Sequence, residues 1–246
     1  MYSGPTMMDA GTILRYLQDV DAERERRASS VELLERVHAL KAYQQRRFSH
    51  TYADLLAAPR YRAAALFFLH DLYGPQDFAS RDAQFARVVP ALVRLFPQDI
   101  VATVATLAEL HALSEQLDSA MAFKLESSRV NADAYVRAWL ATGRADARQR
   151  QIDLTLTVGE ALDRLTRNPL LRHSLRLMRN PARAAGLYAL QQFLERGFDV
   201  FKEMRGSQQF LLIIGERERA LAQALFSALP TERGEVNTSI LEMLPQ

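Results

Sequence analysis

The chain has 246 residues and no cysteine, which excludes disulfide bonds, thiolate metal sites and a cysteine nucleophile. At this length about 75% of the surface of the unfolded chain can be buried on folding, so the chain is long enough for a large core. The net charge is only +2, and apolar runs such as Phe210 to Ile214 are far shorter than the ~20 residues of a membrane-spanning helix.

The N-terminal stretch MYSGPTMMDAG has no basic segment followed by an apolar run, which a secretory signal would need. We therefore expect a cytoplasmic protein that is neither secreted nor membrane-spanning. We expect a single all-helical domain over residues 1–229 and a loosely held C-terminal tail over residues 230–246. The polar stretch 126–131 is the place where this domain could divide into two packed halves.

Apolar residues recur with the helical period along the whole chain, and no useful stretch alternates polar and apolar residues as a half-buried strand would. The sequence therefore predicts an all-α fold, a compact multi-helix bundle of about nine or ten helices. The first five expected helices cover residues 9–27, 29–57, 60–73, 77–96 and 99–123. The sixth carries Tyr135 and Trp139 and ends at Gly143, and the seventh covers residues 146–166. The last three begin at residues 168, 180 and 207, and the final two end at residues 204 and 229.

Local signals mark several helix boundaries. Ser29 and Glu32 have the S-x-x-E spacing of a capping box at the start of the second helix. Gly74-Pro75 has the order that ends a helix, with a glycine followed by a proline that cannot continue it. Pro90 lacks the backbone N–H that a helix interior needs, so we expect it to kink or divide the fourth helix.

Two Asn-Pro pairs, Asn168-Pro169 and Asn180-Pro181, each place a capping side chain beside a proline suited to a first helical turn. They lie in an unusually basic segment, because residues 164–194 contain six arginines and no acidic residue. An anionic partner would most plausibly meet the chain in this segment.

The stretch FFLHDLYG at residues 67–74, followed by PQDFASRDAQFARVVP, resembles the signature of the FFLEELY-motif proteins, an uncharacterised bacterial family. The stretches LAELHALSEQLD, AYVRAWLATGR and MRNPARAAGLYALQQFLERGFDVF also look similar. The resemblance covers most of the chain and implies one domain, but it implies no reaction or ligand. The chain departs from the signature because His70 and Asp71 stand where the motif has two glutamates.

Asp71 has two interpretations. It borders the apolar stripe that includes Phe68, so it could be a carboxylate held in a partly buried pocket. It could instead pair with Arg81 or Arg87 of the next helix, and the sequence favours this structural role because an unpaired buried charge costs several kcal/mol. On this interpretation His70 lies at the edge of the helix and can be replaced with little effect on stability. The candidate pocket or motif residues of this region are Phe68, Asp71, Tyr73 and Asp82.

The fifth expected helix carries His111, Glu115 and Asp118 at positions i, i+4 and i+7, which forms one polar line beside an apolar stripe. Such a line could hold a metal ion or relay a proton. Glu35 and His38 have the Glu-x-x-His spacing that di-iron bundles use twice, but the sequence contains one copy. We therefore predict neither a metal nor another cofactor.

The segment 164–183 is the other candidate site. Arg172, Arg176 and Arg179 share one helix face, and apolar residues share another, which gives a basic amphipathic helix. Nucleic acid, an acidic protein or a lipid surface could use this face. A solvated arginine face that pairs with acidic residues of other helices is the favoured interpretation, because arginine is common throughout the chain.

The sequence contains no serine nucleophile elbow, phosphate-binding glycine loop or dinucleotide fingerprint. The leading hypothesis is a non-catalytic cytoplasmic domain that acts through protein contacts, as a homodimer. The first alternative is a small-molecule or metal-dependent enzyme with a pocket between helices near Asp71 and His111. The second is an anionic-polymer binder that uses the arginine-rich segment 164–183, although nucleic acid is the less expected partner.

Overall fold

The computed structural model describes residues 9–72, 78–228, 241 and 243–245. Within these residues the chain forms twelve α-helices and one π-helical turn and no β-strand, which confirms the expected all-α fold. The elements are α1 (Ala10–Ala28), α2 (Val31–Thr51), α3 (Ala53–Ala57), α4 (Pro59–Phe67), the π-helical turn η1 (Phe68–Leu72), α5 (Ala79–Leu95), α6 (Gln98–Lys124), α7 (Ala132–Thr142), α8 (Ala145–Thr166), α9 (Pro169–Leu177), α10 (Arg179–Ala184), α11 (Tyr188–Glu203) and α12 (Gln208–Ser227).

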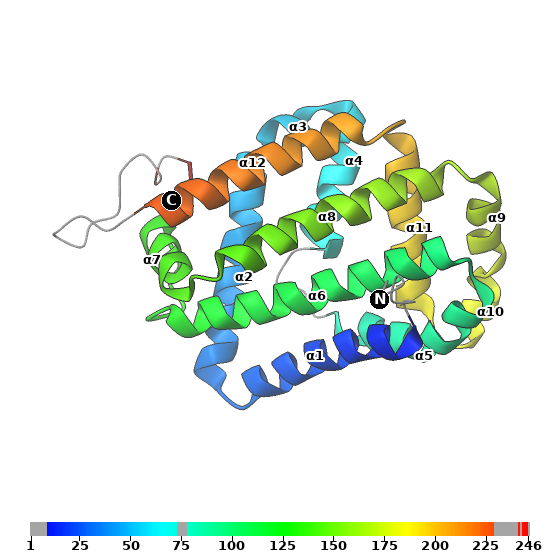
Figure 1. Ribbon diagram of the computed structural model, residues 1–246, viewed down its shortest axis with the longest axis horizontal. Helices are drawn as coiled ribbons and strands as arrows, with labels where there is room; N and C mark the ends of the chain where they lie inside the picture. Colours follow the sequence, from blue (N-terminus) through cyan, green and yellow to red (C-terminus); the bar gives the residue numbers. More distant parts are fainter. Residues whose placement is uncertain (1–8, 73–77, 229–240, 242, 246) are drawn as a thin grey trace, which may run out of the picture.

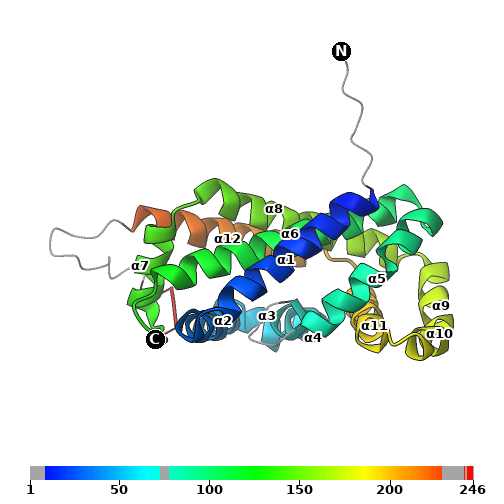
Figure 2. The same ribbon diagram turned by 90° about the horizontal axis from the view of Figure 1, so that it is seen from below.

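The helices form two layers that cross each other (Figure 1). One layer holds four long helices side by side in the order α1, α6, α8 and α12, and each contacts the next. The other layer holds α2, α4 and α11, which run across the first layer and lie beneath it in Figure 2. The helix α5 contacts both α1 and α11, so it joins the two layers, while α7 lies at one end of the molecule and α9 and α10 lie at the other.

Polar side chains fix where several helices begin. The side chains of four N-cap residues each accept a hydrogen bond from a backbone N–H of the first turn: Asp9, Ser30, Asn131 and Asn168. The prediction that Ser29 caps the second helix was wrong by one residue, because the N-cap of α2 is Ser30. Ser29 is instead the C-cap of α1, and its hydroxyl donates back to the carbonyl of Arg26 at 2.7 Å.

Two of the expected helices are divided, which raises the number of helices above the nine or ten predicted. The stretch 29–57 breaks at Tyr52, whose φ of −115° and ψ of 27° are not helical. The stretch 180–204 breaks before α11, where Gly186 has φ of 70° and the N–H of Leu187 bonds the carbonyl of Ala182 at 2.8 Å. A residue with φ in this left-handed region is most easily a glycine, so Gly186 sets the turn.

One other boundary prediction was wrong, and for Pro90 one of the two expected effects is excluded. Asn180 does not cap a helix, because it lies in the first turn of α10, whose N-cap is Met178. Pro90 does not divide its helix, because α5 continues from Ala79 to Leu95 with the proline inside it. The packing of α5 against α1 and α11 compensates for the one backbone hydrogen bond that Pro90 cannot make. Gly74-Pro75 lies outside the described residues.

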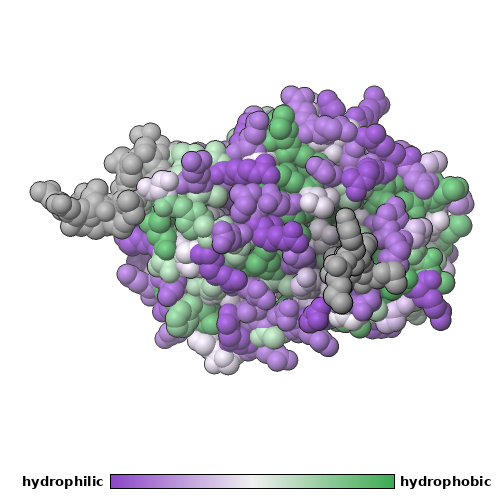
Figure 3. All heavy atoms as spheres, in the orientation of Figure 1, coloured by the Kyte–Doolittle hydropathy of each residue, from purple (hydrophilic) through white to green (hydrophobic). Residues whose placement is uncertain are grey.

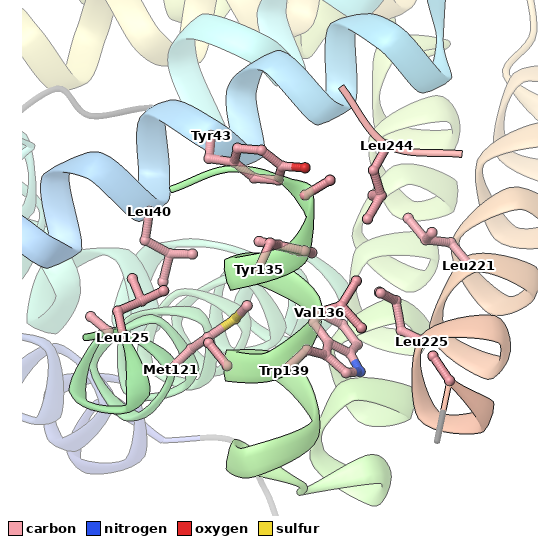
Figure 4. Close-up of a cluster of buried hydrophobic side chains, with 14 of the residues drawn as sticks. Leu40, Tyr43, Met121, Leu125, Tyr135, Val136, Trp139, Leu221, Leu225 and Leu244 are labelled. Carbon is pink, nitrogen blue, oxygen red and sulfur yellow. The ribbon is translucent and has the colours of Figure 1, made fainter. Parts of the chain in front are cut away.

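A buried apolar cluster joins α2, α6, α7 and α12 at one end of the molecule (Figure 4). The rings of Tyr43 and Tyr135 lie 4.8 Å apart, and Trp139 packs beside Tyr135. Leu244 is buried in the same cluster, and the hydroxyl of Tyr43 donates to the carbonyl of Pro245 at 2.9 Å. The described residues near the C-terminus therefore contact the core.

The helices α8 and α12 approach closely because each presents a glycine to a leucine of the other. A Cβ on Gly159 would lie 2.5 Å from a methyl carbon of Leu211, and a Cβ on Gly215 would lie 3.0 Å from a methyl carbon of Leu156. Close packing in protein interiors leaves little room for added atoms, so these two glycines set the distance between the helices.

We predict that Gly159→Ala lowers the free energy of unfolding by about 1 to 3 kcal/mol, because the added methyl group overpacks the contact with Leu211. Gly11→Ala is the matched control, since its Cβ would meet nothing closer than 3.5 Å. In that exposed first turn alanine should leave stability unchanged or raise it by up to about 1 kcal/mol. Denaturant unfolding of both variants measures the difference, and a Gly159→Ala protein as stable as the parent would contradict this account.

Candidate functional site

A cavity of about 160 Å³ lies where α6 and α8 of one layer meet η1, α5 and α11. Its walls are mostly apolar side chains from these elements, including Phe85, Val88, Val158 and Phe193. Its polar lining comes from the four helices α2, α5, α6 and α8 and consists of Lys41, Gln44, Arg81, Asp82, His111, Ser114, Glu115, Asp118 and Thr155. The cavity is therefore an apolar space with charged groups along part of its wall.

The structure brings five of the seven candidate pocket residues together at this cavity. They come from a stretch of the chain in which the first and the last lie 50 positions apart: Phe68, Asp82, His111, Glu115 and Asp118. Asp71 is not among the lining residues. Tyr73 lies outside the described residues, although its neighbour Leu72 and the residue that follows the gap, Phe78, both line the cavity.

The π-helical turn η1 explains why Phe68 and Asp71 separate. The turn widens the end of α4, and the carbonyl of Leu69 accepts a hydrogen bond from Gln45 of α2 at 3.1 Å. Phe68 and Leu72 face the cavity, whereas His70 is exposed. Single π-helical turns are frequent at functional sites, so the position of η1 beside the cavity is consistent with a site there.

Asp71 pairs with a different arginine from those expected. Its carboxylate accepts a hydrogen bond from Arg196 of α11 at 2.6 Å, while Arg81 donates to the backbone carbonyl of Asp71 at 2.8 Å. Arg87 reaches the carbonyl of Ala185 instead. The helix α11 packs directly on α4, so its arginine lies nearer to the carboxylate of Asp71 than the side chains of α5 do.

Asp82 is the first of two carboxylates shared by several cations. Arg24 of α1 donates to its Oδ2, and Nε2 of His111 lies 2.8 Å from the same oxygen. Arg81 lies 3.5 Å from its Oδ1. Burial alone would raise the pKa of Asp82, but the hydrogen bonds with His111 and Arg24 lower it to about 2. Asp82 is therefore ionised at neutral pH.

Glu115 is the second shared carboxylate. Arg27 of α1 donates to its Oε2, and Lys41 of α2 donates to its Oε1 at 2.6 Å. Arg27 also donates to the backbone carbonyl of Glu115 at 2.6 Å and to the hydroxyl of Ser119 at 2.7 Å. Burial would raise the pKa of Glu115, but the positive charges of Lys41 and Arg27 lower it to about 2.

Asp118 lies between the main cavity and a second cavity of about 80 Å³. Gln44, Phe68 and Thr155 also line both cavities. Gln44 donates to Oδ1 of Asp118 at 3.0 Å, and Lys41 stays 4.0 Å from Oδ2. Burial raises the pKa of Asp118, which distinguishes it from the two fully paired carboxylates.

Sequence reasoning missed the cations of this cluster, although two of them left a signal. Ile13, Leu17 and Val20 form the buried stripe of α1, and Arg24 and Arg27 continue that stripe at the same spacing of three and four residues. An arginine at a core position of an amphipathic helix indicates a buried acidic partner. Lys41 and Arg81 left no comparable signal.

The candidate metal ligands do not converge. Among the residues that the structure describes, no three His, Asp or Glu side chains are arranged so that they could hold a metal ion. Glu35 and His38 are exposed on α2, away from the cavity lining. Asp82 and Glu115 are each engaged by cations, so neither offers a free carboxylate to an added ion.

The arginine segment lies at the end of the molecule formed by α9, α10 and α11. Arg172 pairs with Asp199 at 2.7 Å, and Arg179 pairs with Glu195 at 2.5 Å. Both acids belong to α11. Figure 3 shows a mostly hydrophilic face with separate apolar patches, including some at the end where α9 lies, and Leu170 and Leu177 of α9 are 73% and 64% exposed.

These features define an all-helical, two-layer domain with a cavity between the layers. The chain belongs to the family described as a domain of unknown function, DUF8198, whose model matches residues 23–232. The matched range includes every described residue that lines the cavity except Leu17. No curated protein and no solved structure matches the chain. In the described part of the chain, every helix is too short or too polar to cross a bilayer.

We predict that Glu115→Gln lowers the free energy of unfolding by about 3 to 5 kcal/mol, because it leaves Arg27 and Lys41 without their shared buried carboxylate. The folded pKa of Glu115, about 2, lies below its ordinary value of 4.5. Its contribution to stability is therefore complete above pH 4.5 and is lost as the pH falls towards 2. Denaturant melts between these pH values should show a flatter pH dependence for Glu115→Gln than for the parent, and equal slopes would contradict the pairing.

We predict that Asp71→Asn lowers stability by about 1 kcal/mol, since its partner Arg196 is half-exposed, whereas His70→Gln changes stability by less than about 0.5 kcal/mol. Arg196→Gln should cost about as much as Asp71→Asn, and the double variant should cost little more than either. Denaturant melts of the four proteins complete the cycle. Independent, additive effects would show that the pair does not stabilise the end of η1.

Proposed function

We propose that this protein binds a small, largely apolar molecule in the cavity between its two helical layers. The observation that carries the proposal is the meeting of apolar walls with a few charged groups in one cavity. Small-molecule sites in proteins typically combine these two features, because apolar surface supplies affinity and a few polar groups fix orientation.

The size of the cavity limits the ligand. A closed apolar cavity of roughly 150 Å³ accommodates a molecule such as benzene. The main cavity, with about 160 Å³, therefore suits one ring or a short aliphatic chain. The second cavity shares Gln44, Phe68, Asp118 and Thr155 with the first, so a small movement of these side chains would admit a longer molecule.

The charged groups support binding because they are already held in place. Asp82 is fixed by Arg24 and His111, and Glu115 is fixed by Arg27 and Lys41. Groups that are ordered before binding lose little freedom when the ligand arrives, which favours affinity. We assign them a role in orienting the ligand and no chemical step.

The other expectations from the sequence stay predictions. The resemblance of FFLHDLYG to the FFLEELY signature supports the further proposal that this family is bacterial. The cytoplasmic location, the homodimer and the contacts with a protein partner are likewise proposals. They are compatible with ligand binding, because the cavity lies between the layers and leaves the outer helix faces free.

Two adjacent valines of α5 test the proposal. Val88 lines the cavity, whereas Val89 is fully buried elsewhere in the core. Benzene or indole at about ten times its Kd should raise the Tm of the parent by about 2 to 4 °C. Val88→Phe should remove this response because the new ring occupies the cavity.

Val89→Phe is the matched control, and it should lower stability by about 1 to 3 kcal/mol through overpacking while keeping the response to the probe. Thermal melts of the three proteins with and without probe provide the measurement. The proposal fails if no small apolar probe stabilises the parent, or if Val88→Phe responds as the parent does.

A further inference from the structure

Several cations beside the cavity share two buried carboxylates. Asp82 and Glu115 are the ion-pair partners of four cationic side chains, namely Arg24, Arg27, Lys41 and Arg81. His111 is a fifth partner when it is protonated. Asp118 is the third carboxyl group of the cluster, and its burial favours the neutral, protonated form. Arg24 has a further partner in Asp21 at 3.0 Å, so the cations of this cluster differ in how fully they are paired.

Arg81 is the cation of this cluster with the weakest pairing. Within the described residues it makes one hydrogen bond, from Nη1 to the backbone carbonyl of Asp71. Its distance of 3.5 Å to Asp82 is longer than the contacts that Arg24 and His111 make with the same carboxylate. Burial lowers the pKa of Arg81, because the charge of Asp82 does not compensate fully for the loss of solvent.

Two aromatic rings hold the guanidinium of Arg81 in a defined plane. The Cζ atom lies 4.1 Å from the ring centroid of Phe78 and 4.4 Å from that of Phe193. Both rings also line the cavity. A guanidinium stacked on aromatic faces keeps its N–H donors at the edge, and this edge matches the two oxygens of a carboxylate.

The neighbouring helix end adds to the positive potential. Phe78 is the N-cap of α5, and Arg81 lies in the first turn of this helix of 17 residues. The N-terminal end of a helix carries partial positive charge, which favours an anion nearby. This effect is secondary to the charge of Arg81 and acts in the same direction.

We propose that the ligand of the cavity is a small organic anion, a carboxylic acid with a compact apolar body, whose carboxylate binds Arg81. The inference rests on the proposed function, since it names the class of molecule that the cavity takes. The apolar body occupies the space lined by Phe85, Val88 and Val158, and the carboxylate gives Arg81 a closer partner than Asp82, which lies 3.5 Å away.

Three probes of similar shape test the charge preference on the parent protein: benzoate, benzamide and benzylamine. Calorimetric titration at pH 7 should give a Kd for benzoate at least about tenfold lower than for benzamide, because a charge-assisted pair is stronger than a neutral hydrogen bond. Benzylammonium should bind most weakly, since it brings a second positive charge to Arg81.

Arg81→Met keeps a long apolar side chain between Phe78 and Phe193 but removes the charge. It should bind benzoate and benzamide equally, whereas Arg81→Lys should retain part of the preference. Arg87→Met is the matched control, because Arg87 lies on the same helix, is exposed and does not line the cavity. It should keep the parent's preference.

The outcomes separate this inference from the function on which it rests. If benzene and benzamide bind as tightly as benzoate, or if benzylamine binds best, the cavity binds apolar molecules but the carboxylate assignment is overturned. If neither benzene nor any of the three probes binds the parent, both proposals are overturned. Should Arg81→Met fail to fold, the probe series on the parent decides the assignment by itself.

Discussion

The interior of this protein is organised by the need of buried charges for partners. Arg27 is 4% exposed and Glu115 is 6% exposed, so neither can exchange its partner for water. Their contact joins α1 to α6, and Lys41 joins α2 to the same carboxylate. Replacing such a set by apolar residues is often neutral in stability, but breaking it is costly. The pairing therefore fixes how α1 and α2 sit along α6 more than it adds net stability.

The cavity follows from the same arrangement. The polar line of α6 faces the interior between the layers, where Asp82 of α5 and Lys41 of α2 approach it. Apolar side chains of α8 and α11 line the rest of the cavity, including Val158 and Phe193. Helices that cross between layers meet at few points along their lengths, and the space between the contacts remains unless large side chains fill it. In this protein part of that space stays open beside the charges.

The stretch that carries the family resemblance lies at the edge of this cavity and supports its wall. Phe68 lines both cavities, while Asp71 fixes the end of η1 through Arg196 of α11. Arg81 connects the two roles, because it donates to the carbonyl of Asp71 and faces the cavity with its charge. His70 is exposed and takes no part in these contacts. The stretch thus supports the wall of the cavity, and Phe68 and Leu72 line it directly.

The sequence by itself determined the helical class, because apolar residues with helical spacing leave no other way to bury the core. It also determined the start of α9, since Asn168 caps its own first turn. It identified His111, Glu115 and Asp118 as one line, because helical spacing alone puts them on one face. Only the tertiary structure decided what that line meets. The partners Arg24, Arg27, Lys41 and Arg81 come from other helices, and the distance in sequence, 88 residues between Arg27 and Glu115, carries no periodic signal. The chain breaks at Gly186, and Asp71 pairs with Arg196. Both features depend on how α11 packs against α4, which is a property of the assembled layers and of no single segment.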